Sequence, residues 1–417
     1  MSWNWRRSLL LLLALAGFAE LVMRGIVPAH YPGKNDFSDP YVGALLWRQG
    51  QNPWDGALMT YTAKKLGVVG SPVIPVYPLT TYVVVAPFSF LTWKWANVLW
   101  VTLSVLAACV IPWLLLQIGE LNLRTQDKAW LLIGLAMAYP PMHSAIHVAN
   151  AGVIAVALCF ASVLLAKRRQ DLAAGIAIAI STGLKPQLGM WVLLFYLLRG
   201  RWRVAATAIS GLAVLALAAV SRLATRLPEV MATYRADLQY SFRPGGGADF
   251  SGIDPMRYHM LNSQVVLWQI VRSRELANLL AFLLLAAALG ALAYIVFRKG
   301  VSSEPLVLTS LVALSFIATY HRVTDATFFT LVLCWVLSDG SEELRRIKGV
   351  VLFCLLLLFL PVHSFIMRLE PHLGPGVMAS WPWNLLVMPS FAWLLLIFDG
   401  ALLMAVAASA RPATGRP

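Results

Sequence analysis

The chain has 417 residues, of which 59% are hydrophobic and 12% are charged, against roughly 25% charged residues in an average soluble domain. A chain of this composition cannot cover its surface with polar side chains in water, which excludes an ordinary soluble globular protein and predicts a protein embedded in lipid. The net charge of +14 does not predict nucleic-acid binding, because the basic residues form short clusters between apolar runs, as in the cytoplasmic loops of membrane proteins.

The first apolar run predicts an uncleaved membrane span. It follows Arg6 and Arg7 and extends from Ser8 to about Val27, which is longer than the apolar core of a secretory signal. A spanning helix needs about 20 such residues, and on this basis the sequence predicts about twelve spans. They lie near residues 8–28, 96–118, 129–146, 148–166, 171–185, 186–199, 204–222, 276–297, 303–320, 324–338, 349–367 and 385–408. A break between the fifth and sixth is expected at Lys185-Pro186, because proline removes a helix donor and restricts the residue before it.

A further apolar run, from Val73 to Trp93, is better explained as an interfacial helix. If it crossed the membrane, most of the later basic clusters would fall on the outer side. Its prolines and its terminal tryptophans Trp93 and Trp95 also suit the headgroup region. With this assignment the segments 29–95 and 223–275 are external. All seven histidines then lie on or near the outer face, which favours a single working face there.

The first external segment contains two acidic residues beside a predicted short helix. Asp36 and Asp39 precede and flank Pro40, and the apolar spacing from Tyr41 onward suits an amphipathic helix that ends at Gly50. An aspartate at this position could cap the helix or act in catalysis, and the sequence leaves both open.

Other polar groups follow at the predicted outer ends of spans. Lys185 is notable, because its predicted outer position opposes the usual bias of positive charge toward the cytoplasm. The remaining candidates for substrate contact are Tyr77, His147, Asn150, Asn262, Gln264, His321 and Arg322. The four cysteines, Cys109, Cys159, Cys334 and Cys354, fall in apolar runs and predict neither disulfides nor a metal site.

The order of these motifs resembles glycosyltransferase family 87. Over about residues 8–340, the chain has Asp36-Phe37 and the following loop, Tyr77-Pro78, a polar Asn150 turn, Gly183-Leu184-Lys185-Pro186, Asn262-Ser263-Gln264 and a His321 turn. It differs from the usual pattern at Leu79, at Val148-Ala149 and at Arg322. These differences leave the donor sugar and the acceptor open.

The resemblance implies an all-α integral membrane protein with the GT-C fold, formed by residues 1–417 as one domain. It implies transfer of a hexose, such as mannose, from a polyprenyl-phosphate donor to an envelope glycolipid or glycan, with inversion. The site would face the extracytoplasmic side of the plasma membrane, without a cofactor or metal. Asp36 matches the family's early-loop aspartate, the expected base, and Asp39, three residues on, is the alternative. Lys185, Arg322 and Arg243 are expected at the donor phosphate, and Asp39, Tyr41, Tyr77, His147, Asn150, Asn262, Gln264 and His321 at the substrates.

Two other functions are compatible with such a chain. A transporter or flippase for a lipid-linked precursor would also bring polar residues into a helix bundle, but such proteins tend to show internal repeats and binding groups near the bilayer midplane. A structural subunit of an envelope-assembly complex would tolerate substitution of Asp36.

Overall fold

The computed structural model describes residues 5–29, 35–68, 76–123, 127–251, 260–301, 303–338, 342–358, 360 and 362–410. Within these residues the regular structure is helical, apart from one isolated bridge between Met260 and Arg322. The chain divides into two compact units, Met1–Phe242 and Arg243–Pro417, and each is described by itself. His30, His259 and residues 73–75, on which predictions were made, lie outside the described residues.

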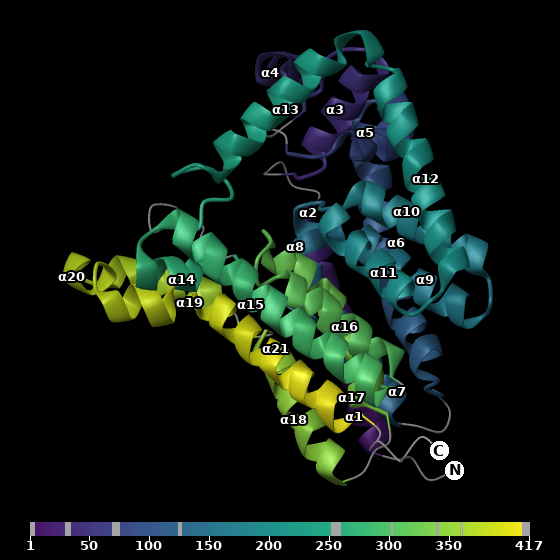
Figure 1. The fold of residues 1–417 in the computed structure, drawn as a ribbon, viewed down its shortest axis with the longest axis vertical. Coiled ribbons are helices and arrows are strands. Elements are labelled where there is room, and N and C mark those ends of the chain that lie inside the picture. Colours follow the sequence, from purple (N-terminus) through teal and green to yellow (C-terminus); the bar gives the residue numbers. More distant parts are fainter. Residues whose placement is uncertain are drawn as a thin grey trace. The chain divides into compact units, whose positions relative to one another are not determined.

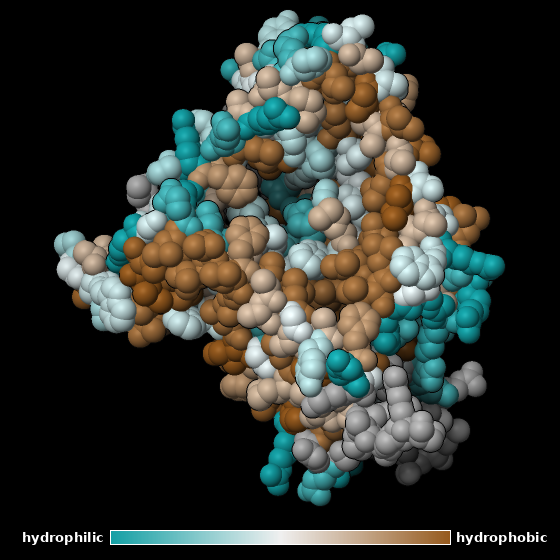
Figure 2. Space-filling model, in the orientation of Figure 1, coloured by the Kyte–Doolittle hydropathy of each residue, from teal (hydrophilic) through white to brown (hydrophobic). Residues whose placement is uncertain are grey.

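Among the described residues, six helical segments are long and apolar enough to cross a membrane, which is consistent with a membrane protein. They are Trp5–Ala29, Trp93–Gly119, Asp127–His147, Trp202–Ser221, Arg274–Arg298 and Ser390–Ala408. Shorter apolar helices lie at five of the other expected spans, and whether they cross the membrane stays a prediction. They are Gly152–Lys167, Asp171–Leu184, Pro186–Leu198, Glu304–Ser315 and Val323–Val336. The exposed faces of long helices are rich in apolar side chains, and Figure 2 shows such surface over α12 and α15.

The first unit is built from helices in sequence order (Figure 1). They are α1 (Trp5–Glu20), η1 (Leu21–Ile26), α2 (Val27–Ala29), α3 (Ser38–Arg48), α4 (Gly56–Lys65), α5 (Leu79–Val85), η2 (Ala86–Phe90), α6 (Trp93–Gly119), α7 (Asp127–Met137), α8 (Pro140–His147), α9 (Gly152–Lys167), α10 (Asp171–Leu184), α11 (Pro186–Leu198), α12 (Trp202–Ser221), η3 (Ala224–Arg226) and α13 (Leu227–Phe242).

Small residues allow the long helices of this unit to approach closely, as is usual in membranes. Helix α1 packs on α7, and a Cβ at Gly17 would lie 2.8 Å from the carbonyl oxygen of Gly134. Helix α10 packs on α9 and α12, and a Cβ at Gly175 would overlap Thr207. The resulting bundle holds the ends of α8, α10 and α11, from which several candidate residues project.

Two local predictions for this unit are confirmed. The short helix expected after Asp36 is α3, and Gly50 follows it with φ of +72°, a conformation that favours glycine. The break expected at Lys185-Pro186 separates α10 from α11.

The apolar run assigned to the membrane interface forms α5 and η2, which together extend from Leu79 to Phe90. This helix is shorter than a typical span, and its position at the membrane interface stays a prediction. It packs on α3, where Gly43 lets the ring of Tyr82 lie directly against the helix backbone.

The second unit contains α14 (Gln264–Val271), α15 (Arg274–Tyr294), η5 (Ile295–Lys299), α16 (Glu304–Ser315), η6 (Val323–Val332), α17 (Leu333–Val336), α18 (Glu342–Leu357), α19 (Val362–Leu369), η7 (Glu370–His372), α20 (Pro375–Met378), η8 (Trp383–Val387) and α21 (Ser390–Ala408). Within it, α21 packs against α16 and α18.

Two expected spans of the second unit differ from continuous α-helices. The run at 324–338 is mostly 3-10 helix, in which Thr327 and Thr330 donate their hydroxyls to carbonyls three residues back. Such side-chain bonds compete with the α-helical pattern. The run at 349–367 is divided between α18 and α19, and Pro361 in the sequence accounts for the interruption.

Candidate active site

Asp36 does not cap α3 with its side chain. The residue at the start of this helix, Phe37, has no side-chain cap, and its N–H donates instead to Oδ1 of Asn35 at 2.9 Å. The carboxylate of Asp36 accepts a hydrogen bond from Nδ2 of Asn150 at 2.8 Å. Of the two roles that the sequence left open for Asp36, the structure therefore removes capping.

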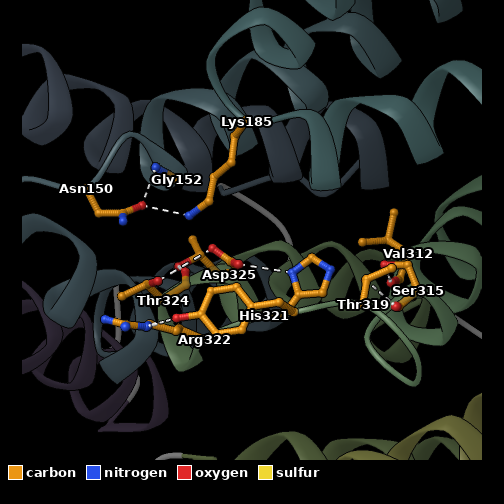
Figure 3. A network of polar contacts seen from close by, with 12 residues as sticks. Asn150, Gly152, Lys185, Val312, Ser315, Thr319, His321, Arg322, Thr324 and Asp325 are labelled. Atoms are coloured by element: carbon orange, nitrogen blue, oxygen red, sulfur yellow. Dashed lines mark hydrogen bonds and ion pairs between the residues drawn. The ribbon is translucent and has the colours of Figure 1, made fainter. Parts of the chain in front are cut away.

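Asn150 joins Asp36 to Lys185. Its Oδ1 accepts from Nζ of Lys185 at 2.8 Å and from the backbone N–H of Gly152 at 2.8 Å, as Figure 3 shows. Three segments far apart in the sequence thus bring a carboxylate, an amide and an ammonium group into one hydrogen-bonded series. We call these three residues, Asp36, Asn150 and Lys185, the acid–amide–lysine network.

The break between α10 and α11 positions Lys185. The residue has φ of −146° and ψ of 82°. A following proline favours such an extended conformation in the residue before it. Lys185 is only 8% exposed. Its backbone N–H continues the hydrogen bonding of α10 by donating to the carbonyl of Ser181. Burial of a lysine is costly unless it is hydrogen-bonded, and the bond to Asn150 meets that requirement.

The backbone around Asp36 and Asn150 is also tied together. The N–H of Asp36 donates to the carbonyl of Val148 at 2.7 Å, and Nε1 of Trp100 donates to the carbonyl of Ala149 at 2.9 Å. The ring of Trp100 stacks on that of Phe37, with centroids 4.4 Å apart. These contacts hold the turn before α9 against the start of α3.

Tyr77 and Tyr41 lie in the same unit. The hydroxyl of Tyr77 is 3.5 Å from the carbonyl oxygen of Asp36, and its own carbonyl accepts from Nε1 of Trp54. The ring of Tyr41 is buried and its hydroxyl donates to the carbonyl of Leu91 at 2.9 Å. The hydroxyl of Tyr41 is therefore already used in a contact within the protein. Its expected role in substrate binding stays a prediction.

Asp39 lies in the first turn of α3. Burial, and secondly the negative charge of Asp36, raise the pKa of Asp39 to about 7, against an opposing effect of the Ser38 hydroxyl. Two carboxyl groups in one neighbourhood with different environments are a common arrangement where proton transfer occurs. His147, at the end of α8, has an exposed side chain.

In the second unit, His321 is buried and fixed on two sides. Its Nδ1 is 3.0 Å from Oδ2 of Asp325 (Figure 3), and its ring stacks on Phe316 with centroids 3.7 Å apart. Arg322 donates to the hydroxyl of Tyr320 and to the carbonyl of Gly247. Arg243 is exposed at the start of this unit.

Asn262 and Gln264 pack against the turn that carries His321. Nε2 of Gln264 donates to the carbonyl of Ala318 at 2.8 Å, and its Oε1 accepts from Asn262 at 2.7 Å. The backbone N–H of Leu261 donates to the carbonyl of His321. Oδ1 of Asn262 is buried and has no hydrogen-bond donor among the described residues, so it could accept a bond from a ligand.

The sequence analysis missed several residues that hold these candidates in place. Trp100 and Thr81 brace the first unit, and Asp249 accepts bonds from Arg274, Ser251 and Gly245 in the second. Asp325, by contrast, stands out in the sequence, because it follows His321 by four residues. Among the described residues, no group of three His, Cys, Asp or Glu side chains could hold a metal ion.

These features define an all-helical membrane protein with acidic and basic side chains gathered at helix ends. A comparison with protein families matches residues 76–320 to glycosyltransferase family 87. The match covers more than half of the chain, which belongs to this family and is therefore a membrane glycosyltransferase. It includes Tyr77, Asn150, Lys185, Asn262 and Gln264, whereas Asp36 precedes it. Searches of curated proteins and of solved structures gave no match.

Proposed function

We propose that the protein transfers a hexose, with mannose as the first candidate, from a polyprenyl-phosphate donor to an envelope glycolipid or glycan. The reaction takes place with inversion on the extracytoplasmic face of the plasma membrane, in a GT-C fold of about twelve spans. The observation that supports this most directly is the acid–amide–lysine network, which holds a carboxylate and an ammonium group on opposite ends of one amide.

The two ends of the network suit the two halves of a displacement. The acceptor's hydroxyl oxygen forms a bond to the anomeric carbon while the bond from that carbon to the phosphate oxygen breaks. Asp36 accepts the hydroxyl proton, and the electron pair leaves on the polyprenyl phosphate. Lys185 stabilises the negative charge that develops there.

The other expected residues keep their proposed roles. Arg322 and Arg243 contribute positive charge to the donor phosphate. Asp39, Tyr41, Tyr77, His147, Asn150, Asn262, Gln264 and His321 contact or orient the substrates. The buried, acceptor-capable oxygen of Asn262 supports such a role in the second unit.

An assay of purified protein tests the proposal. Labelled polyprenyl-phosphate sugars are offered with a panel of glycolipid and glycan acceptors, and a product is expected with mannose. Asp36→Asn keeps the shape of the side chain and removes its basicity, so transfer should fall by about 100-fold or more while thermal stability stays near that of the wild type.

Asp39→Asn is the matched control and should retain most of the activity. If Asp39→Asn is inactive and Asp36→Asn is active, Asp39 is the base. If both variants remain fully active with a defined donor and acceptor, the proposed mechanism is wrong. Movement of a lipid-linked precursor across vesicles without transfer would identify a flippase instead.

A further inference from the structure

Asn150 has only one orientation that satisfies its neighbours. Its Oδ1 accepts two bonds, from Lys185 Nζ and from the N–H of Gly152, each 2.8 Å long. A flipped amide would turn an NH₂ group toward these two donors. The contacts on one side of the amide therefore direct its NH₂ group toward Oδ2 of Asp36, which accepts from it at 2.8 Å.

We propose that Asn150 is a positioning residue for the base: it holds the Asp36 carboxylate in one orientation, and Lys185 fixes the amide that does so. This inference rests on the proposed function, in which Asp36 accepts the acceptor's proton. It replaces the direct contact with substrate that the sequence suggested for Asn150.

The arrangement gives Lys185 two tasks. An ammonium group carries three N–H donors, and one of them is given to Asn150. The ammonium group of Lys185, which stabilises the leaving phosphate, therefore also orients the Asn150 amide, and this amide in turn orients Asp36. The two halves of the reaction are connected through two hydrogen bonds.

Several other charged or titratable groups lie on the segments that contact residues 35–37, and they are held constant in the test. Asp39 lies in the first turn of α3, which Asp36 precedes, and the Tyr77 hydroxyl is near the carbonyl of Asp36. His147 ends α8 one residue before Val148, whose carbonyl accepts from Asp36, and Lys94 is exposed at the start of α6. None of these groups is altered by a substitution at residue 150.

Asn150→Asp is the informative variant, because it keeps the shape of the side chain. One carboxylate oxygen can still accept from Lys185 and Gly152, while the other replaces the donor to Asp36 with a second negative charge. A lost hydrogen bond and a nearby like charge both disfavour the ionised form of a carboxyl group. The acid limb of the pH profile of kcat/KM should therefore move upward by about 1 pH unit or more, with activity recovering at higher pH.

Two further variants complete the experiment. Asn150→Ser keeps a hydroxyl that can accept from the N–H of Gly152, but it lacks the longer amide NH₂ group that donates to Asp36. It should move the acid limb in the same direction by less. Asn97→Asp is the control, because Asn97 bonds to Asn35 rather than to Asp36, and its acid limb should stay near that of the wild type. Melting temperatures are measured for all variants.

The outcomes separate this inference from the proposed function. If Asn150→Asp and Asn150→Ser raise KM equally at every pH without moving the acid limb, Asn150 contacts substrate and the inference is wrong. An equal shift in Asn97→Asp would overturn it as well. If Asp36→Asn itself retains activity, the assignment of the base fails, whatever the result at Asn150.

Discussion

The hydroxyl of Thr81 donates to the carbonyl oxygen of Gly183 at 2.9 Å. This bond ties α5, the helix expected at the membrane interface, to the last turn of α10. Lys185 follows Gly183 by two residues and occupies the break before α11. The position of the lysine therefore depends on a helix that lies about 100 residues earlier in the chain.

We expect Thr81→Val to lower kcat/KM for the donor by about 3- to 10-fold. Valine keeps the shape of threonine, but the buried hydrogen bond is lost, at a cost of about 1–2 kcal/mol, and the end of α10 is held less firmly. Thr102→Val is the matched control, because its hydroxyl bonds only within α6, to the carbonyl of Val98. Equal losses in the two variants would show that Thr81 has no special connection to the lysine.

Lys185→Ala should weaken the use of the donor more than that of the acceptor. Removal of a charge-assisted hydrogen bond costs about 1.5–3 kcal/mol, which corresponds to roughly 10- to 100-fold in kcat/KM. Steady-state kinetics with the donor varied measure the effect. Lys64→Ala, at the exposed end of α4, should have almost none. Normal donor kinetics in a folded Lys185→Ala protein would assign this lysine to anchoring alone.

The stability of the protein should depend on pH through Asp39. Its pKa is raised from 3.8 to about 7 by burial and then by Asp36, so the folded state holds a proton that the unfolded state has already released. This stabilising contribution is complete below about pH 4, decreases as the pH rises and is lost above about pH 7. Asp39→Asn removes the titration. The melting temperature of the variant, relative to the wild type, should therefore rise between pH 4 and pH 7 and then level off. A constant difference over that range would contradict the burial of Asp39.

Cysteine labelling on a cysteine-free background tests the topology. Thr60→Cys and Lys94→Cys should both react with a membrane-impermeant reagent from the outer side, because the helix between them is expected to lie at the interface. Arg168→Cys and Arg346→Cys should react only after the membrane is permeabilised. If residues 60 and 94 are labelled from opposite sides, the run ending at Trp93 crosses the membrane.

Much of the helical pattern could be predicted from the sequence, because its causes are local. Apolar runs of sufficient length predicted helices, Pro186 predicted the break after Lys185, and Gly50 predicted the end of α3. The 3-10 helix η6 could not be predicted in this way, because the hydroxyl bonds of its threonines are visible only in the structure.

The contacts within the candidate site were much less predictable. Asp36, Asn150 and Lys185 were each selected, from the resemblance and from their expected positions, but nothing in the sequence indicated that they are bonded to one another. Asp36 and Asn150 are 114 residues apart, and their contact depends on how α3 meets the turn before α9. Helix capping was a reasonable local explanation for Asp36, and it was wrong because α3 has no side-chain cap and the Asp36 carboxylate accepts from Asn150 instead.

Trp100 contacts one residue next to Asp36 and one residue next to Asn150, the two partners of a hydrogen bond. Its ring lies on Phe37, next to Asp36, and its Nε1 holds the carbonyl of Ala149, next to Asn150. The spacing between the acid and its amide is therefore set by a rigid indole on α6, a helix long enough to cross the membrane. A carboxylate held in this way has little freedom to move. In the proposed reaction, the sugar and the acceptor hydroxyl would therefore have to come to Asp36.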